Sequence, residues 1–110
     1  MADTTIQDKI RKKADKRQLL VLKVIANSPT DIVYATAMKE PLYDEVSNST
    51  STAEQTMGGV ISSVVTMRTN EEPLLLAMGK DAYGVRWKLN ERAIKKEELR
   101  ELVNELLASW

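Results

Sequence analysis

The chain has no cysteine and no histidine among its 110 residues. The first absence excludes disulfide bonds and thiolate nucleophiles, and the second excludes imidazole bases. Together they remove the usual protein ligands of zinc, copper and haem iron. Serines occur without a histidine base, and Gly58-Gly59 lacks the Lys-Ser/Thr that completes a phosphate-binding loop. We therefore expect no catalytic residues, no metal site and no cofactor.

Long apolar runs are also missing. No stretch approaches the length needed to cross a membrane, and segment 1–17 lacks the apolar core of a signal peptide. We expect a soluble protein without membrane contacts. Its expected location is the cytoplasm, or the nucleoid or nucleus if it binds DNA. The length predicts one domain.

A net charge is absent as well, because 16 basic residues balance 16 acidic residues. A neutral chain is not expected to coat nucleic acid indiscriminately, since such binding depends on neutralising phosphates. The charges are unevenly distributed, however: residues 1–30 carry a net charge of +4 and residues 31–57 a net charge of −4. A basic end marks either an anion-facing surface or a solvated helix face.

The first part of the chain is predicted to form one helix, from Thr4 or Thr5 to about Asn27. Its basic residues gather in the first half, where cations oppose the helix macrodipole. Pro29 ends this helix. The next eight-residue segment, Ile32 to Lys39, is predicted as a short helix, although its first three residues also suit a brief strand.

The stretch from Thr52 to Arg68 has the periodicity of an amphipathic helix. Its apolar stripe consists of Met57, Val60, Ile61, Val64 and Val65. Overlapping capping-box patterns beginning at Ser51 and Thr52 indicate its start, and Arg68 suits its last turn. The opposite face is small and uncharged. It includes two glycines, each of which costs a helix about 1 kcal/mol relative to alanine. This cost favours a role in which something approaches the helix closely.

Two strand-like runs follow this helix. Pro73 to Met78 is apolar, and Val85 to Leu89 alternates between apolar and basic residues. Gly79 and Gly84 bound the loop between the two runs. This pattern predicts a β-hairpin.

The chain is predicted to end in a helix from Glu91 to about Ser109, capped by Asn90. Its apolar stripe either closes the core or receives a partner helix, and the second interpretation predicts a homodimer. The dimer-interface candidates are Leu99, Leu102, Val103, Leu106 and Trp110.

The sequence thus predicts a mainly α protein with a small β-hairpin, an α+β class. Over residues 17–89 the order of elements resembles a winged helix-turn-helix. The run PLLLAMGKDAYGVR from Pro73 is similar to the wing segment of HARE-type winged-helix domains, in which an apolar strand leads to a glycine-basic-x-x-tyrosine turn. We divide the chain into a basic N-terminal helix extension (1–16), a winged-helix domain (17–89) and a C-terminal amphipathic helix (90–110).

This resemblance implies a DNA-binding transcriptional regulator, with helix 52–68 in the major groove of double-stranded DNA and hairpin 73–89 as the wing. The candidates to face the bases are Gln55, Thr56, Gly59, Ser62, Ser63 and Thr66. The candidates to contact phosphates are Arg68, Lys80, Arg86 and Lys88. The alternative is a protein–protein interaction module that uses the same helix face without binding DNA, since small neutral residues pack well on another helix.

Overall fold

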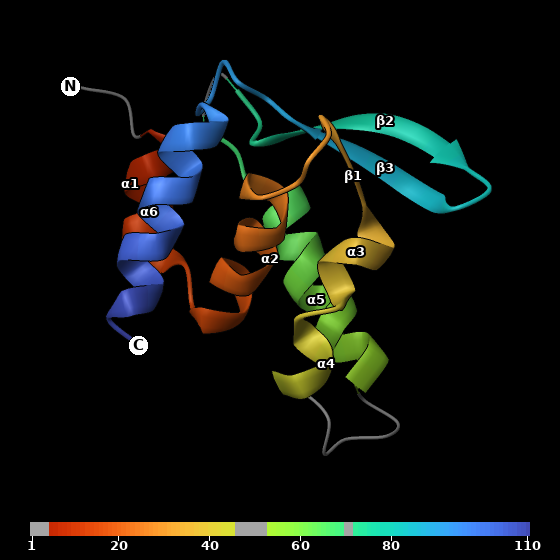
Figure 1. Cartoon of the computed structure of the whole chain (residues 1–110), viewed down its shortest axis with the longest axis horizontal. Helices are drawn as coiled ribbons and strands as arrows, with labels where there is room; N and C mark the ends of the chain where they lie inside the picture. Colours follow the sequence, from red (N-terminus) through yellow and green to blue (C-terminus); the bar gives the residue numbers. More distant parts are fainter. Residues whose placement is uncertain (1–4, 46–52, 70–71) are drawn as a thin grey trace.

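Helix α2 lies at the centre of the molecule, with α6 and α1 on one side and α3, α4 and α5 on the other (Figure 1). The structure is a computed structural model, and it describes residues 5–45, 53–69 and 72–110. In chain order the elements are α1 (Ile6–Lys13), α2 (Lys16–Ala26), β1 (Ile32–Tyr34), α3 (Ala35–Lys39), α4 (Leu42–Glu45), α5 (Ala53–Val65), β2 (Leu75–Asp81), β3 (Gly84–Leu89) and α6 (Lys96–Ala108). The α+β class predicted from the sequence is confirmed.

The apolar residues of α2 explain its central place. Its buried positions are Leu19, Val21, Leu22, Ile25 and Ala26. They surround more of the helix than a single stripe does, so that α2 contacts α3, α4, α5 and α6. A helix that is apolar on several sides is stable only inside a core. The other elements therefore pack around α2.

The prediction of one helix before Pro29 is wrong, because the chain breaks between α1 and α2. Ala14 has an extended backbone conformation, and Asp15 is the N-cap of α2. The Asp15 carboxylate accepts a hydrogen bond from the Gln18 backbone N–H, and the Gln18 side chain accepts one from the Asp15 N–H. This capping box starts a new helix without a proline or glycine.

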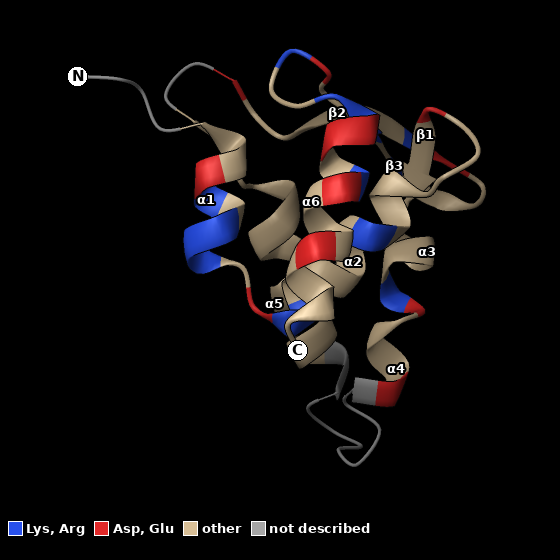
Figure 2. Ribbon diagram, turned by 60° about the vertical axis from the view of Figure 1, so that its left-hand side comes forward, with Lys and Arg blue, Asp and Glu red and all other residues tan. Residues whose placement is uncertain are grey.

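The break also reverses the expected electrostatics of the basic residues. Arg11, Lys12 and Lys13 lie in the last turn of α1 and not in the first half of a longer helix (Figure 2). Cations at a helix C-terminus interact favourably with the macrodipole. The predicted misfit with the helix dipole is therefore wrong for these three residues, whereas Lys16 and Arg17 lie in the first turn of α2, where the misfit remains.

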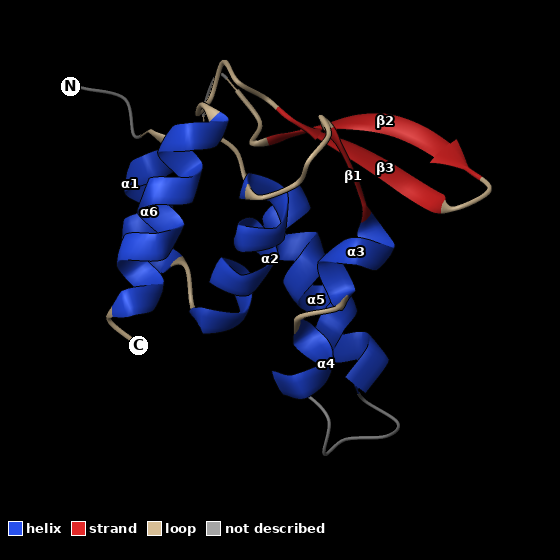
Figure 3. Ribbon diagram, viewed as in Figure 1, coloured by secondary structure: helices blue, strands red, loops and turns tan. Residues whose placement is uncertain are grey.

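The segment after Pro29 begins with a strand, as the alternative prediction had it. Strand β1 is followed directly by α3, and it pairs antiparallel with β3, so that Val33 lies opposite Trp87. The sheet order is β1-β3-β2 (Figure 3). Val33 is buried, which places this side of β1 on the core.

The predicted hairpin is confirmed as β2 and β3, but its loop is shorter than expected. Strand β2 continues through Gly79 to Asp81, with a register shift between Ala77 and Lys80. Gly79 has a φ of 85° in this bulge, a conformation that glycine adopts without strain. The hairpin projects past α3 (Figure 1).

Helix α5 is shorter than predicted at its C-terminal end. It ends at Val65, and Arg68 forms an isolated antiparallel bridge with Pro73 instead of lying in the last turn. Because this bridge aligns the chain with the start of the hairpin, the helix cannot continue through it. The predicted caps Ser51 and Thr52 lie outside the described residues.

The last helix begins later than predicted, at Lys96. Asn90 is buried and does not cap it. The Asn90 side-chain amide donates hydrogen bonds to the Pro73 carbonyl and to the Glu72 carboxylate, each at 2.9 Å. Asn90 therefore holds the turn after β3 against the start of the hairpin.

The apolar stripe of α6 packs within the chain, against α2 and α1. Of the predicted dimer-interface residues, Leu99, Leu102 and Val103 are buried in the core of the single chain. Leu106 is half-buried, and Trp110 lies beyond the helix with 63% of its surface exposed. The stripe thus closes the core, and a homodimer through the remaining C-terminal surface stays a prediction.

Candidate nucleic-acid interface

Helix α5 carries the main candidate surface. Met57, Ile61 and Val64 are buried, which confirms the predicted apolar stripe. The exposed residues on the other side are Gln55, Gly58, Gly59, Ser62 and Thr66. Since residues spaced by three or four positions share a helix face, Gln55, Gly59, Ser62 and Thr66 form one continuous uncharged stripe. We call these four residues the α5 stripe.

Two of the predicted base-facing residues do not belong to this stripe. Ser63 accepts a hydrogen bond from the Gln18 side chain at 2.9 Å and donates one to the Val60 carbonyl at 2.6 Å. Ser63 therefore faces α2, and its prediction as a base-facing residue is not supported by its position. Thr56 is half-buried. Both lie at the border of the apolar stripe, where helical periodicity does not decide which way a small polar residue points.

The glycines of α5 face open space. Among the described residues, and apart from the two chain neighbours and the local helix backbone, no atom lies within 4 Å of a Cβ placed at Gly58 or Gly59. Packing inside the chain therefore does not require glycine at either position. The helix keeps a smooth surface at a cost of about 1 kcal/mol per glycine.

The predicted phosphate contacts differ in their freedom to bind. Lys80 and Arg68 are exposed. Arg86 is half-buried, and its guanidinium donates a hydrogen bond to the Met78 carbonyl at 2.8 Å. This bond fastens β3 to the bulge of β2, so Arg86 holds the hairpin together. The bulge, which the sequence did not predict, brings the Met78 carbonyl within its reach.

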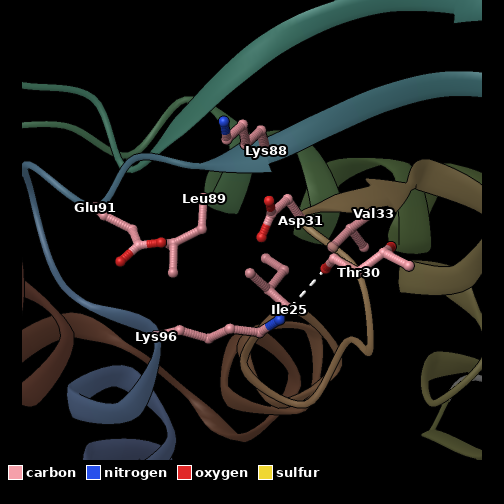
Figure 4. A pocket seen from close by; sticks show the side chains of 8 residues that line it. All are labelled: Ile25, Thr30, Asp31, Val33, Lys88, Leu89, Glu91 and Lys96. Carbon is pink, nitrogen blue, oxygen red and sulfur yellow. Dashed lines mark hydrogen bonds between the residues drawn. The ribbon is translucent and has the colours of Figure 1, made fainter.

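Lys88 is half-buried beside a small cavity of about 10 Å³ (Figure 4). The cavity is lined by Ile25, Thr30, Asp31, Val33, Lys88, Leu89, Glu91 and Lys96. The Lys96 ammonium donates hydrogen bonds to the Ser28 and Thr30 carbonyls. Such a volume holds about one water molecule, so the space suits no larger ligand. Through these bonds Lys96 holds the loop that follows α2 at the edge of the cavity.

The tip of the hairpin is anchored to β1 by Tyr34, Asp81 and Tyr83, of which the sequence singled out only the tyrosine of the predicted turn. The Tyr34 hydroxyl donates a 2.7 Å hydrogen bond to the Asp81 carboxylate, which also accepts one from the Tyr83 backbone N–H. The Tyr83 ring meets the Tyr34 ring edge-on at a centroid distance of 6.1 Å. The Asp81–Tyr83 contact is an Asx turn, a local pattern that the sequence contains. The contact with Tyr34 has no local signal.

The hydrogen bond between Tyr34 and Asp81 shifts both groups. It lowers the pKa of the Asp81 carboxyl, with a further contribution from the Tyr83 N–H, because both donors stabilise the carboxylate. The same bond raises the pKa of the Tyr34 hydroxyl, since ionised tyrosine can no longer donate it. The hairpin tip is therefore held best at pH values between these two titrations.

Charged residues gather on α1 and α6. The Arg11 guanidinium forms an ion pair with Glu105, and the Gln7 side chain donates a 3.2 Å hydrogen bond to Glu98. Figure 2 shows the basic positions of α1 and the acidic positions along α6. One flank of α1 is thus matched to acidic residues of α6.

The described residues contain no group of three or more acidic, histidine or cysteine side chains that could hold a metal ion. Within the same part of the chain, none of the helices combines the length and the apolar character needed to cross a membrane. No protein-family model, curated protein or solved structure matches this chain. Its function must therefore be inferred from its own residues.

Proposed function

We propose that this chain is a winged-helix protein that binds double-stranded DNA and regulates transcription. In this proposal α5 enters the major groove and the β2–β3 hairpin is the wing. The order α2, β1, α3–α4, α5, β2, β3 and the sheet order β1-β3-β2 are compatible with a winged helix. In helix-turn-helix proteins the second helix of the motif is the one that reads the groove, and we assign this role to α5 because it follows α3 and α4 in the chain.

The observation that carries the proposal is the exposed α5 stripe. An amide such as that of Gln55 pairs with adenine, and the hydroxyls of Ser62 and Thr66 can bond base edges or phosphates. Gly59, between them, lets the helix backbone approach closely. The Thr66 hydroxyl donates to the Ser62 carbonyl at 2.6 Å, which leaves its oxygen as an acceptor.

Two exposed cations belong to the other parts of the proposed interface. Arg68 follows α5, and Lys80 is on the hairpin. Contacts with phosphates fix the register of a protein on DNA without reading its sequence. We assign this role to Arg68 and Lys80, with Lys88 as a weaker contributor because it is half-buried. Arg86 acts by holding the hairpin.

The test is fluorescence anisotropy with random-sequence duplex DNA at low salt. We expect the wild type to bind and Gly59→Glu to lose binding, because the new carboxylate repels phosphates while the open space accepts the side chain without a clash. Arg68→Ala with Lys80→Ala is expected to weaken binding roughly equally across sequences. The matched control is Lys23→Ala with Lys95→Ala, two exposed lysines away from this surface. Equal losses in both pairs would contradict the assigned contacts.

A protein-interaction role is the second candidate. It is favoured by the lack of any lysine or arginine within α5, since groove-reading helices commonly carry such residues. In that case no duplex binds at low salt, and Gly59→Glu instead abolishes the capture of a protein partner from the native host.

A further inference from the structure

Helix α1 lies outside the elements that form the proposed winged helix, and it has three distinct sides. Ile6 and Ile10 are buried, and Gln7 and Arg11 contact α6. At 100° per residue, Lys9 and Lys13 fall on the flank opposite Gln7 and Arg11. Lys12 points away from the buried side. Helix α1 is therefore matched to acids on one flank, and the rest of its exposed surface carries Lys12 and Lys13 together with Asp8.

The basic flank lies next to the end of α5. The Lys9 ammonium donates a hydrogen bond to the carbonyl of Arg68, three residues after α5 ends. The start of α2, which follows α1 directly, contacts α5 through the bond between Gln18 and Ser63. The first contact places Lys9 of α1 at the segment that follows the proposed recognition helix, and the second places the start of α2 against that helix.

Two exposed cations at the C-terminal end of α1 have no partner inside the described part of the chain. Lys12 and Lys13 are exposed, and no described residue forms an ion pair or hydrogen bond with either side chain. Asp8, one turn before Lys12, is the nearest acid on α1, and its carboxylate faces the Thr5 backbone N–H. The acidic residues of α6 contact the opposite flank. Arg68 adds a further exposed cation at the junction with α5.

We infer that α1 is part of the DNA interface and contacts the phosphate backbone through Lys12 and Lys13, beside the groove that holds α5. This inference rests on the proposed function. The major groove is about 12 Å wide and bordered by phosphates, so an element next to one end of a groove-bound helix lies beside a backbone strand. The placement of the cations suits phosphate contacts and gives no sequence readout.

The salt dependence of binding tests this inference. Each phosphate contact contributes about 0.9 to the slope of log K against log salt. We expect Lys12→Gln with Lys13→Gln to reduce this slope by about 2 and to lower the affinity for all duplexes. Lys12→Arg with Lys13→Arg should restore the wild-type slope. The matched control, Lys23→Gln with Lys95→Gln, changes the net charge equally and should leave the slope near that of the wild type.

The outcomes separate this inference from the proposed function. If the wild type, the Lys12→Gln/Lys13→Gln variant and the control variant all bind DNA with the same salt slope, α1 does not contact phosphates, although the chain binds DNA. If the Lys12→Gln/Lys13→Gln variant and the control variant reduce the slope equally, the effect is one of overall charge and the inference is wrong. If the wild type binds no duplex at low salt, both the proposed function and the role of α1 fail. Circular dichroism of each variant checks that α1 and the rest of the fold are retained.

Discussion

Gly59 occupies an exposed position in the middle of α5, where an added methyl group meets open space. Glycine loses more backbone entropy than alanine when it enters a helix. We therefore expect Gly59→Ala to raise the free energy of unfolding by about 1 kcal/mol, and Gly58→Ala to do the same. Denaturant unfolding measures both changes. A loss of stability would mean that the glycine surface already packs within the chain.

The same variants separate stability from binding. If the chain keeps glycine so that DNA can approach the α5 backbone, Gly59→Ala weakens DNA binding although it stabilises the fold. Gly58, which lies beside the α5 stripe, is the matched control, and we expect Gly58→Ala to affect binding less. Equal affinities for wild type and Gly59→Ala would contradict the close approach.

Asp81 holds the hairpin tip through its hydrogen bond with Tyr34. Because its pKa is lowered in the folded protein, its contribution to stability is present above the ordinary pKa of aspartate and is lost as the pH falls through the folded value. We expect Tyr34→Phe to raise the pKa of Asp81 back toward its ordinary value, and so to reduce the loss of stability below about pH 4. An NMR titration of the carboxyl carbons measures this pKa.

Tyr83→Phe is the control for that experiment. It removes a hydroxyl but keeps both donors to Asp81, the Tyr34 hydroxyl and the Tyr83 backbone N–H. The pKa of Asp81 should then stay lowered. At high pH the titrating group is Tyr34, and stability then falls as the pH rises. The raised pKa of Tyr34 gives stability that is present below the ordinary tyrosine pKa and is lost as the pH rises through the folded value. An unchanged pKa of Asp81 in Tyr34→Phe would contradict the assignment.

Single residues divide into those that local patterns predict and those that they do not. The α5 stripe was predicted because its spacing alone fixes a helix face. Ser63 was misplaced because its partner, Gln18, lies on another helix. Strand alternation predicts a phosphate contact for Arg86, because it places Arg86 on the same face as Lys88. The bulge that supplies the backbone partner of Arg86 is not visible in that alternation.

At the scale of the element, the joint between α1 and α2 depends on one capping box. Asp15→Ala removes the carboxylate that accepts from the Gln18 N–H, and we expect it to lower the free energy of unfolding by about 1 kcal/mol. Asp15→Asn is the control, because asparagine caps helices about as well as aspartate. Denaturant unfolding compares the three proteins. If Asp15→Ala is as stable as Asp15→Asn, the side-chain cap does not hold the joint.

The errors at element boundaries have a common physical origin. Residues 5–27 contain neither glycine nor proline, so the break at Ala14 is visible only through the Asp-x-x-Gln pattern of the cap. Asn90 matches an N-cap equally well, but its amide is used by Glu72 and Pro73 at the other end of the hairpin. Helix periodicity is a local property, whereas these boundaries are set by which residues meet in space.

For the whole molecule, the order of helices and strands followed from punctuation by Pro29, Gly79 and Gly84 together with the two periodicities. Strand β1 has the weakest signal in the sequence, because its three residues are too few to distinguish a strand from a helix by pattern. It forms because β3 offers an edge on which Val33 can lie opposite Trp87 and enter the core. Pairing with β3, which is distant in the sequence, therefore makes Ile32–Tyr34 a strand where the local sequence suits either a strand or a helix.

The oligomeric state is the last question at this scale. Since Leu99, Leu102 and Val103 are buried within one chain, a homodimer through the end of α6 has to use the C-terminal surface that remains, and Trp110 is the largest exposed apolar side chain there. We expect Trp110→Glu to convert a dimer into a folded monomer, as measured by light scattering during size-exclusion chromatography. Leu102→Glu should instead unfold the chain, because it removes a buried leucine and places a charge in the core. A wild type with the mass of a monomer at high concentration would rule out the dimer, and a folded dimer of Trp110→Glu would place its interface elsewhere.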